Sequence, residues 1–293
     1  MATVRKIYLD SRFCLPGGKG SNFTYELGQT VQCGPNCVGY VCDVCLPVSW
    51  PTIGANNQML YMIERSLDGT TAQGRIFTVP PGSYNAATLA TAIQTALNGA
   101  GNPSTGLGGT YTVTYDADAN KYTFSNPAIG FQLVDEYHLD QHYGWQTEWQ
   151  WTGTGLKPNG PTYDYRNPRY INHMLGVPSL KGSSVDYWPY ASSVTLGVLD
   201  LRSVHSVYIH SDALSTFNVV TPSGAPNCIR RVPVALSFGE VIHEGFSVSP
   251  FDCLELHDVT LKTIDVKLLD VYGRELDLQG GHISFSVVLS EKA

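Results

Sequence analysis

Residues 260–289 read TLKTIDVKLLDVYGRELDLQGGHISFSVVL, and this stretch decides the fold class. In two runs of this stretch, apolar residues recur at every second position, which is the period of a β-strand. One strand places on a single face Thr260, Lys262, Ile264, Val266 and Leu268, and the next places Ile283, Phe285, Val287 and Leu289. Both strands are too long and too apolar on one face to stand as a lone hairpin. We therefore expect them to be part of a larger β-structure.

The same alternation, interrupted by turn residues, recurs along the whole chain. With 17 Tyr, 17 Pro and 29 Gly against 18 Lys plus Arg, the composition favours strands joined by turns. Further strands are predicted at Val38–Leu46, Met59–Glu64, Arg75–Val79, Tyr111–Tyr115, Tyr122–Ser125, Ser193–Leu199, Val204–His210, Ile229–Leu236 and Leu254–His257. In the first of these, one face would carry Val38, Tyr40, Cys42, Val44 and Leu46. The pattern predicts an all-β sandwich, jelly roll or barrel, and periodicity does not choose among them.

One helix interrupts the strands. Asn85 can cap it, Leu89, Ile93 and Leu97 fall on one stripe, and Asn98-Gly99 closes it. We expect this helix and a hairpin to form an insertion at about 80–190 in a jelly-roll domain of residues 31–293. Strands of 190–293 should pair with strands of the first 80 residues. Residues 1–30 should form an extended amino-terminal arm.

The charge content points to assembly. The 293 residues include only 15% charged residues, against roughly 25% in an average soluble protein. Such a surface favours burial against other subunits. The net charge of −7 and the lack of a Lys/Arg run argue against direct nucleic-acid binding. No stretch approaches the 18 apolar residues of a transmembrane segment, and we expect no secretory signal.

Four of the seven cysteines, Cys33, Cys37, Cys42 and Cys45, lie within 13 residues and raise the possibility of a zinc site. In an extended strand, Cys42 and Cys45 differ by an odd offset and would point to opposite faces of the sheet. We therefore favour buried structural thiols over zinc or disulfides and expect no metal site.

Two other segments contain metal-capable residues. Glu136, His138, Asp140 and His142 would share one face of a strand, and we interpret them as a polar face that could be interfacial. The segment 116–120 begins like a calcium loop, but Lys121 and Pro127 stand where that loop needs Gly and Glu. A β-turn explains this segment.

Catalytic motifs are not found. Residues 17–21, GGKGS, have the wrong glycine spacing for a phosphate loop and are interpreted as a flexible arm. The sequence contains no nucleophile elbow, zinc-protease motif or dinucleotide fingerprint. We expect no enzyme activity, no catalytic residues and no cofactor.

The order of several short segments resembles one family: the penton and minor capsid proteins of double-stranded DNA viruses with a double-jelly-roll major capsid protein. This lineage includes polinton-like and adintovirus-like elements and giant-virus relatives. The segments are YLDSR at 8–12, SNFTYEL at 21–27, LPVSW at 46–50, VPPGSYN at 79–85, NHMLG at 172–176 and LDLQGGH at 276–282. The chain departs from the family pattern in the amino-terminal segment, at Cys14 and Asn22.

The resemblance implies a structural protein of an icosahedral capsid, most simply the penton at the five-fold vertex. It also implies a homopentamer located in the virion, with the major capsid protein as a partner. A minor or cement protein, or a jelly-roll capsomer subunit, is the alternative within the same virion. A carbohydrate-binding β-sandwich is a remote alternative, because Trp145, Trp149 and Trp151 could stack on sugars.

Overall fold

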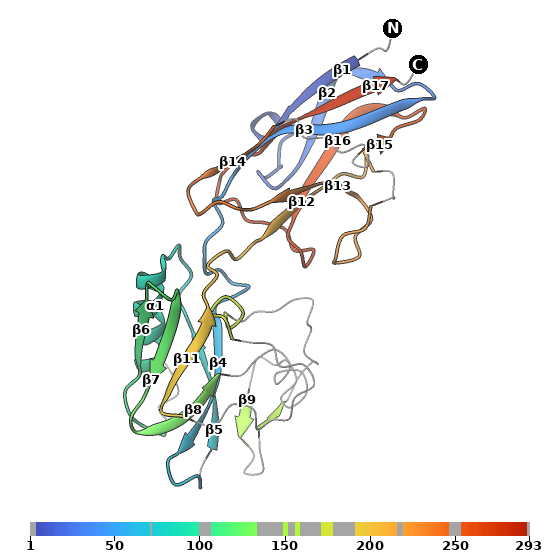
Figure 1. Ribbon diagram of the computed structural model, residues 1–293. Helices are drawn as coiled ribbons and strands as arrows, with labels where there is room; N and C mark the ends of the chain where they lie inside the picture. Colours follow the sequence, from blue (N-terminus) through green and yellow to red (C-terminus); the bar gives the residue numbers. More distant parts are fainter. Residues whose placement is uncertain are drawn as a thin grey trace. The chain divides into compact units, whose positions relative to one another are not determined.

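The chain forms two compact units (Figure 1), which are described one at a time. The computed structural model describes residues 4–70, 72–99, 107–133, 149–151, 156–158, 171–177, 191–215, 219–245 and 253–291. The first unit combines Met1–Trp50 with Val204–Ala293, and the second is the intervening segment, Pro51–Ser203. The inserted unit is therefore wider than the expected 80–190, because two early strands, at Met59–Ser66 and Ala72–Thr78, belong to it.

The first unit contains two antiparallel sheets. Its strands are β1 (Val4–Asp10), β2 (Asn22–Gln32), β3 (Cys37–Pro47), β12 (Ser206–His210), β13 (Cys228–Pro233), β14 (Val241–Glu244), β15 (Leu254–Glu255), β16 (Thr260–Leu269) and β17 (Ser284–Glu291). One sheet has the order β1-β17-β3-β14, with β15 also paired to β3, and the other has the order β13-β12-β16-β2.

The pairing of these strands is nested. The first strand pairs with the last (β1 with β17), the second with the last but one (β2 with β16), then β3 with β14, and finally β12 with β13. This is a chain folded back on itself and rolled into two sheets, which is the jelly-roll arrangement. The expected all-β jelly roll is confirmed, as is the pairing of the last strands with strands near the amino terminus.

The two long terminal strands lie in different sheets and do not pair with each other. Ile264, Val266 and Leu268 of β16 and Phe285 and Val287 of β17 are all buried in one core between the sheets. Periodicity identified both strands and the apolar face of β17. In β16 the predicted face is wrong at its start, because the register shift between Leu261 and Thr263 puts Leu261 in the core and leaves Thr260 and Lys262 exposed. Periodicity did not identify the partners of the two strands, because a strand with one apolar face can bury it equally well against a second sheet.

A β-bulge interrupts β3. Ser284 and Ser286 of β17 lie opposite Cys45 and Cys42, so one residue of β17 faces two residues of β3. Asp43 at the bulge has a φ of 51°. Val41, Val44 and Leu46 consequently face the core. The predicted face that grouped Val38, Tyr40 and Cys42 with Val44 and Leu46 is wrong, because the extra residue reverses the alternation.

Residues 1–30, expected to be an extended arm, contain β1 and most of β2. The short 3-10 helix η1 (Ser11–Phe13) connects them, with the Asp10 side chain accepting from Arg12 N at its start. The GGKGS segment is held by backbone hydrogen bonds, including Lys19 N to Asn22 O at 2.8 Å. Gly20 lies so close to Gly281 that a Cβ would come within 2.1 Å of its carbonyl oxygen. The segment is therefore a packed turn in place of the flexible arm expected.

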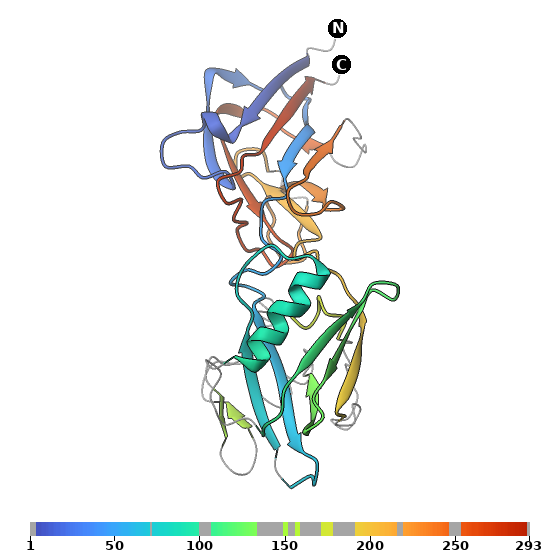
Figure 2. The ribbon, with the colours of Figure 1, turned by 90° about the vertical axis from the view of Figure 1, so that its left-hand side faces the viewer.

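The second unit has its own core. Its elements are β4 (Met59–Ser66), β5 (Ala72–Thr78), α1 (Ala86–Asn98), β6 (Thr112–Asp116), β7 (Lys121–Ser125), β8 (Ile129–Leu133), β9 (Trp149–Trp151), β10 (Leu156–Pro158) and β11 (Ser193–Val198). They form three sheets, ordered β5-β4-β8, β11-β7-β6 and β10-β9. The predicted helix is confirmed, with a capping box between Asn85 and Thr88, and it packs against β6 and β5 (Figure 2).

A buried ion pair lies in this second core. Glu64 of β4 is 2% exposed and pairs with Arg75 of β5 at 3.2 Å. It also accepts from the Tyr111 hydroxyl at 2.9 Å and from Leu107 N at 3.2 Å. Burial and the Glu64 carboxylate both raise the pKa of Tyr111, so this hydroxyl stays protonated and donates. The network connects a sheet to the loop before β6.

We expect Glu64→Gln to destabilise the second unit by about 3–5 kcal/mol, since it leaves the Arg75 charge buried without its partner. Denaturant unfolding followed by circular dichroism measures this change. Asp118→Asn, the same chemical change at an exposed turn residue, is the control and should change stability by less than about 0.5 kcal/mol. An equal effect of the two substitutions would contradict a stabilising role for the ion pair.

Candidate assembly surface

The edge strand β1 presents apolar side chains to solvent. Val4 is 62% exposed and Tyr8 68%, on the face opposite the buried Leu9. Lys6 lies between them, its Nζ 2.5 Å from an Asp43 carboxylate oxygen and 5.0 Å from the centre of the Tyr8 ring. Because β1 ends its sheet, its outer backbone edge has no strand beside it among the described residues. An exposed apolar edge strand is a typical site of contact with another chain.

The exposed surface continues into η1 and on to Leu15, two residues after its end. Phe13 is 71% exposed and Leu15 38%. Arg12 places its guanidinium beside the Phe13 ring and donates from Nε and Nη2 to the Asp10 carboxylate. The side-chain hydrogen bond from Arg12 makes the largest contribution to lowering the pKa of Asp10. We call Arg12, Phe13 and Leu15 the η1 patch.

A second exposed apolar group lies at the opposite edge of the same sheet. Phe238, in the turn before β14, is 50% exposed, and Val241, the first residue of β14, is 39% exposed. Glu240 between them is exposed, and its carboxylate accepts from Ser237 N at 2.5 Å. We call Phe238, Glu240 and Val241 the β14 patch. Nearby, Arg230 and Glu244 form an ion pair at 3.4 Å between the edge strands of the two sheets.

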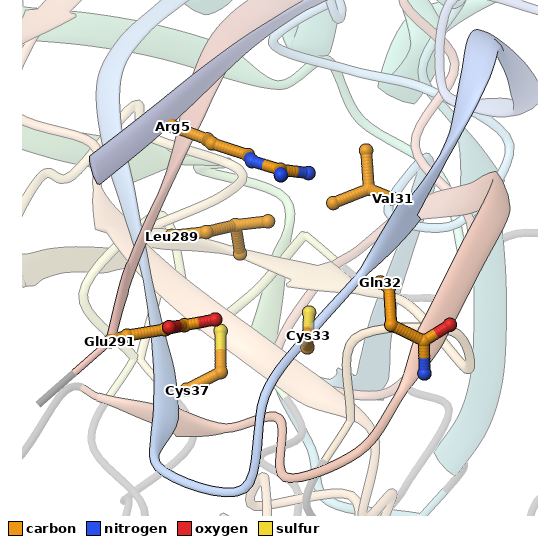
Figure 3. Close-up of a pocket in the computed structure, with 7 residues that line it drawn as sticks. All are labelled: Arg5, Val31, Gln32, Cys33, Cys37, Leu289 and Glu291. Carbon is orange, nitrogen blue, oxygen red and sulfur yellow. The ribbon is translucent and has the colours of Figure 1, made fainter. Parts of the chain in front are cut away.

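A small pocket lies at the end of the sandwich where β1 begins and β17 ends. Figure 3 shows Arg5, Cys33, Cys37 and Glu291 around it, and its volume is about 20 Å³. That is room for roughly one water molecule. Burial, followed by the hydrogen bond with Cys37, raises the pKa of Cys33 to about 12. The Cys33 thiol is therefore protonated at neutral pH, and both cysteines serve as core residues.

The four clustered cysteines divide between two faces. Cys33 and Cys37 belong to the core between the sheets. Cys42 and Cys45 lie opposite Ser286 and Ser284, which are two residues apart, so they share the outer face of their sheet. The predicted opposite faces of Cys42 and Cys45 are wrong because of the bulge at Asp43. In the part of the chain described, no three His, Cys, Asp or Glu side chains come together as metal ligands.

Other predicted residues have different outcomes. Glu136, His138, Asp140, His142 and Trp145 lie outside the described residues, and of Trp149 and Trp151 only the backbone strand is described. The segment 116–120 is confirmed as a turn: Asp116 pairs with Lys121, and its side chain accepts from Asp118 N and Ala119 N.

The described part of the chain contains no helix with the length and apolarity needed to cross a membrane.

Nothing in the sequence sets His210 apart from the other histidines of the chain. It follows the core residue Ile209 on β12, is 5% exposed, and its Nε2 has no hydrogen-bond partner among the described residues. Burial lowers its pKa, Lys267 on β16 lowers it further, and Asp212 raises it. Cys228 of β13 lies on its other side. The imidazole is therefore neutral at neutral pH.

Comparison with solved structures finds a likeness over the whole chain, whereas the sequence comparisons find none. No protein-family model matches the sequence, and no curated protein matches it. The crystal structure of the selenomethionine-labelled penton protein of mavirus is similar, with a TM-score of 0.53 and 11% sequence identity. The match covers 100% of this chain and 100% of that one. The chain therefore has a penton-like, all-β fold along its whole length.

We expect the four cysteines not to bind zinc jointly, since two lie in the core and two on the outer face. Elemental analysis of protein purified without chelators should give far less than one zinc per chain. One zinc per chain, lost in the Cys42→Ser or Cys45→Ser variant, would contradict this expectation.

The pKa of His210 predicts a pH dependence. The unfolded chain binds a proton on this residue at a higher pH than the folded chain does, so stability falls as pH drops through about 6.5 towards the lower folded pKa. Denaturant unfolding of wild type and His210→Gln at about pH 7.5 and 5.5 measures this effect. The wild type should lose more stability on acidification than the variant. Equal losses would show that His210 is not a source of the pH dependence.

Proposed function

We propose that this chain is a structural protein of an icosahedral viral capsid and that it forms the penton at the five-fold vertex. The observation that carries the proposal is the nested jelly roll, together with a likeness to a penton protein that spans both chains. The segment order that resembles penton and minor capsid proteins supports the same function independently.

The surface of the first unit fits this function. In a ring of identical subunits, each copy contacts its two neighbours through two different surfaces, which meet head to tail. Such a contact forms a closed ring when the rotation that relates neighbouring copies returns to the first copy. This sandwich exposes apolar side chains at both edges of one sheet, Tyr8 and Phe13 at one and Phe238 and Val241 at the other. The low charge content of the chain reduces the desolvation cost of burying such edges.

The buried and partly buried carboxylates support a structural function over catalysis. Glu64 accepts from Leu107 N, Asp265 from Asp212 N and Ala213 N, and Asp270 from Arg274 N. Each carboxylate is thereby used to hold a loop or turn in place. We propose that the protein has no enzyme activity and no cofactor. Its partners would be further copies of itself and the major capsid protein of the same virion.

The test is the oligomeric state of the purified full-length protein. We expect mass photometry and negative-stain images to show rings with the mass of five 31.9 kDa chains. Co-expression with the other shell proteins should place the chain at capsid vertices. A stable trimer would favour a capsomer subunit. A monomer at high concentration that never enters shells would overturn the capsid function, and glycan-array binding by that monomer would favour the carbohydrate-binding alternative.

A further inference from the structure

We propose that neighbouring copies of this chain contact each other through the η1 patch of one copy and the β14 patch of the next. The proposal rests on the self-association proposed above and specifies the surfaces that mediate it. It uses only the first unit, where the two patches lie next to the two edge strands of one sheet.

The register of the sheet places the two patches at the same level. Asp10 of β1 lies opposite Ser284, Ser284 opposite Cys45, and Cys45 opposite His243 of β14. These four residues form one row across the whole sheet. The η1 patch begins two residues beyond Asp10, and Glu240 and Val241 lie two to three residues beyond His243 towards the same end of the sheet.

The two patches lie at opposite edges. β1 and β14 are the outer strands of the order β1-β17-β3-β14, so about 14 Å, three strand spacings, separates them within one copy. Figure 2 shows the blue amino-terminal strands along one flank of this unit and orange strands along the other. A rotation about an axis roughly parallel to the strands keeps the level of each patch. It therefore brings the η1 patch of one copy against the β14 patch of the next.

The chemistry of the patches is complementary. Phe13 and Leu15 offer apolar surface on one side, and Phe238 and Val241 offer it on the other. Asp10 occupies Nε and Nη2 of Arg12, which leaves donors of this exposed guanidinium available for a second carboxylate. Glu240 has no cationic partner among the described residues, and its described contact is Ser237 N.

The contact therefore combines an Arg12–Glu240 ion pair between copies with Phe13 packed against Phe238 and Val241. Arginine and aromatic residues contribute a large share of the binding energy at many protein interfaces. This contact contains both. Water is excluded from the ion pair by the surrounding aromatic rings, which strengthens it. Since the two patches differ, each copy retains one free patch after the first contact, and the assembly grows until the ring closes.

A charge exchange tests the contact. Full-length Arg12→Glu and Glu240→Arg should each weaken self-association at least about tenfold, measured by sedimentation velocity over a concentration series. The double variant should recover to within about threefold of wild type, because the ion pair is restored with reversed polarity. Phe13→Ser, which leaves the Asp10–Arg12 pair in place, should weaken assembly as well.

Lys262→Glu and Glu255→Arg, the same charge changes at exposed positions of the same unit, are the matched controls and should assemble like wild type. Circular dichroism confirms that each variant is folded. Rings that persist unchanged in both single variants and in Phe13→Ser would overturn this contact and leave the capsid function standing. Failure of the double variant to recover would overturn the Arg12–Glu240 pairing. A wild-type protein that never self-associates would overturn the capsid function together with the contact.

Discussion

The apolar contact between the two sheets of the first unit is the interaction on which the rest of the structure depends. β16 and β17 supply fully buried side chains to it from opposite sheets, among them Ile264, Leu268 and Val287. Each sheet covers the core-facing apolar side chains of the other, so neither is stable without the other. Because the two sheets cover each other, exposed apolar groups of this unit lie at the edges of the sandwich and at loop and turn residues, among them Val220 and Val271.

Charged residues around this core act locally. Arg12 holds Asp10 at the start of η1, Lys6 holds Asp43 at the bulge, and the Arg230–Glu244 pair joins two edge strands. Each pair lies at a place where the regular ladder of backbone hydrogen bonds ends or is interrupted. A chain with few charged residues can therefore use them in local ion pairs that stabilise single turns and strand ends, while long-range charge repulsion stays low. This agrees with the assembly function that we propose for the chain.

Sequence reasoning identified the elements better than their partners. The helix after Asn85 and the turn after Asp116 were predictable because cap and turn chemistry are local. The bulge at Asp43 was not, since a positive φ at an Asp leaves no signal in an alternating pattern. The boundaries of the inserted unit were not predicted correctly, because the strand at Met59–Ser66 has the same alternating pattern as the strands of the jelly roll. The exposed Phe13 and Phe238 could not be identified, because exposure depends on which strands lie at an edge.

The nested pairing also determines when the protein can fold during its synthesis. Ser11 and His282, whose side chains meet, are 271 residues apart, and β1 cannot enter its sheet until β17 has left the ribosome. The inserted unit is one continuous segment and can close its own core as soon as Ser203 emerges. The first strands made are therefore the last to be paired, and such non-local pairing is slow. During that interval the amino-terminal strands have unpaired edges, and such edges are prone to aggregation.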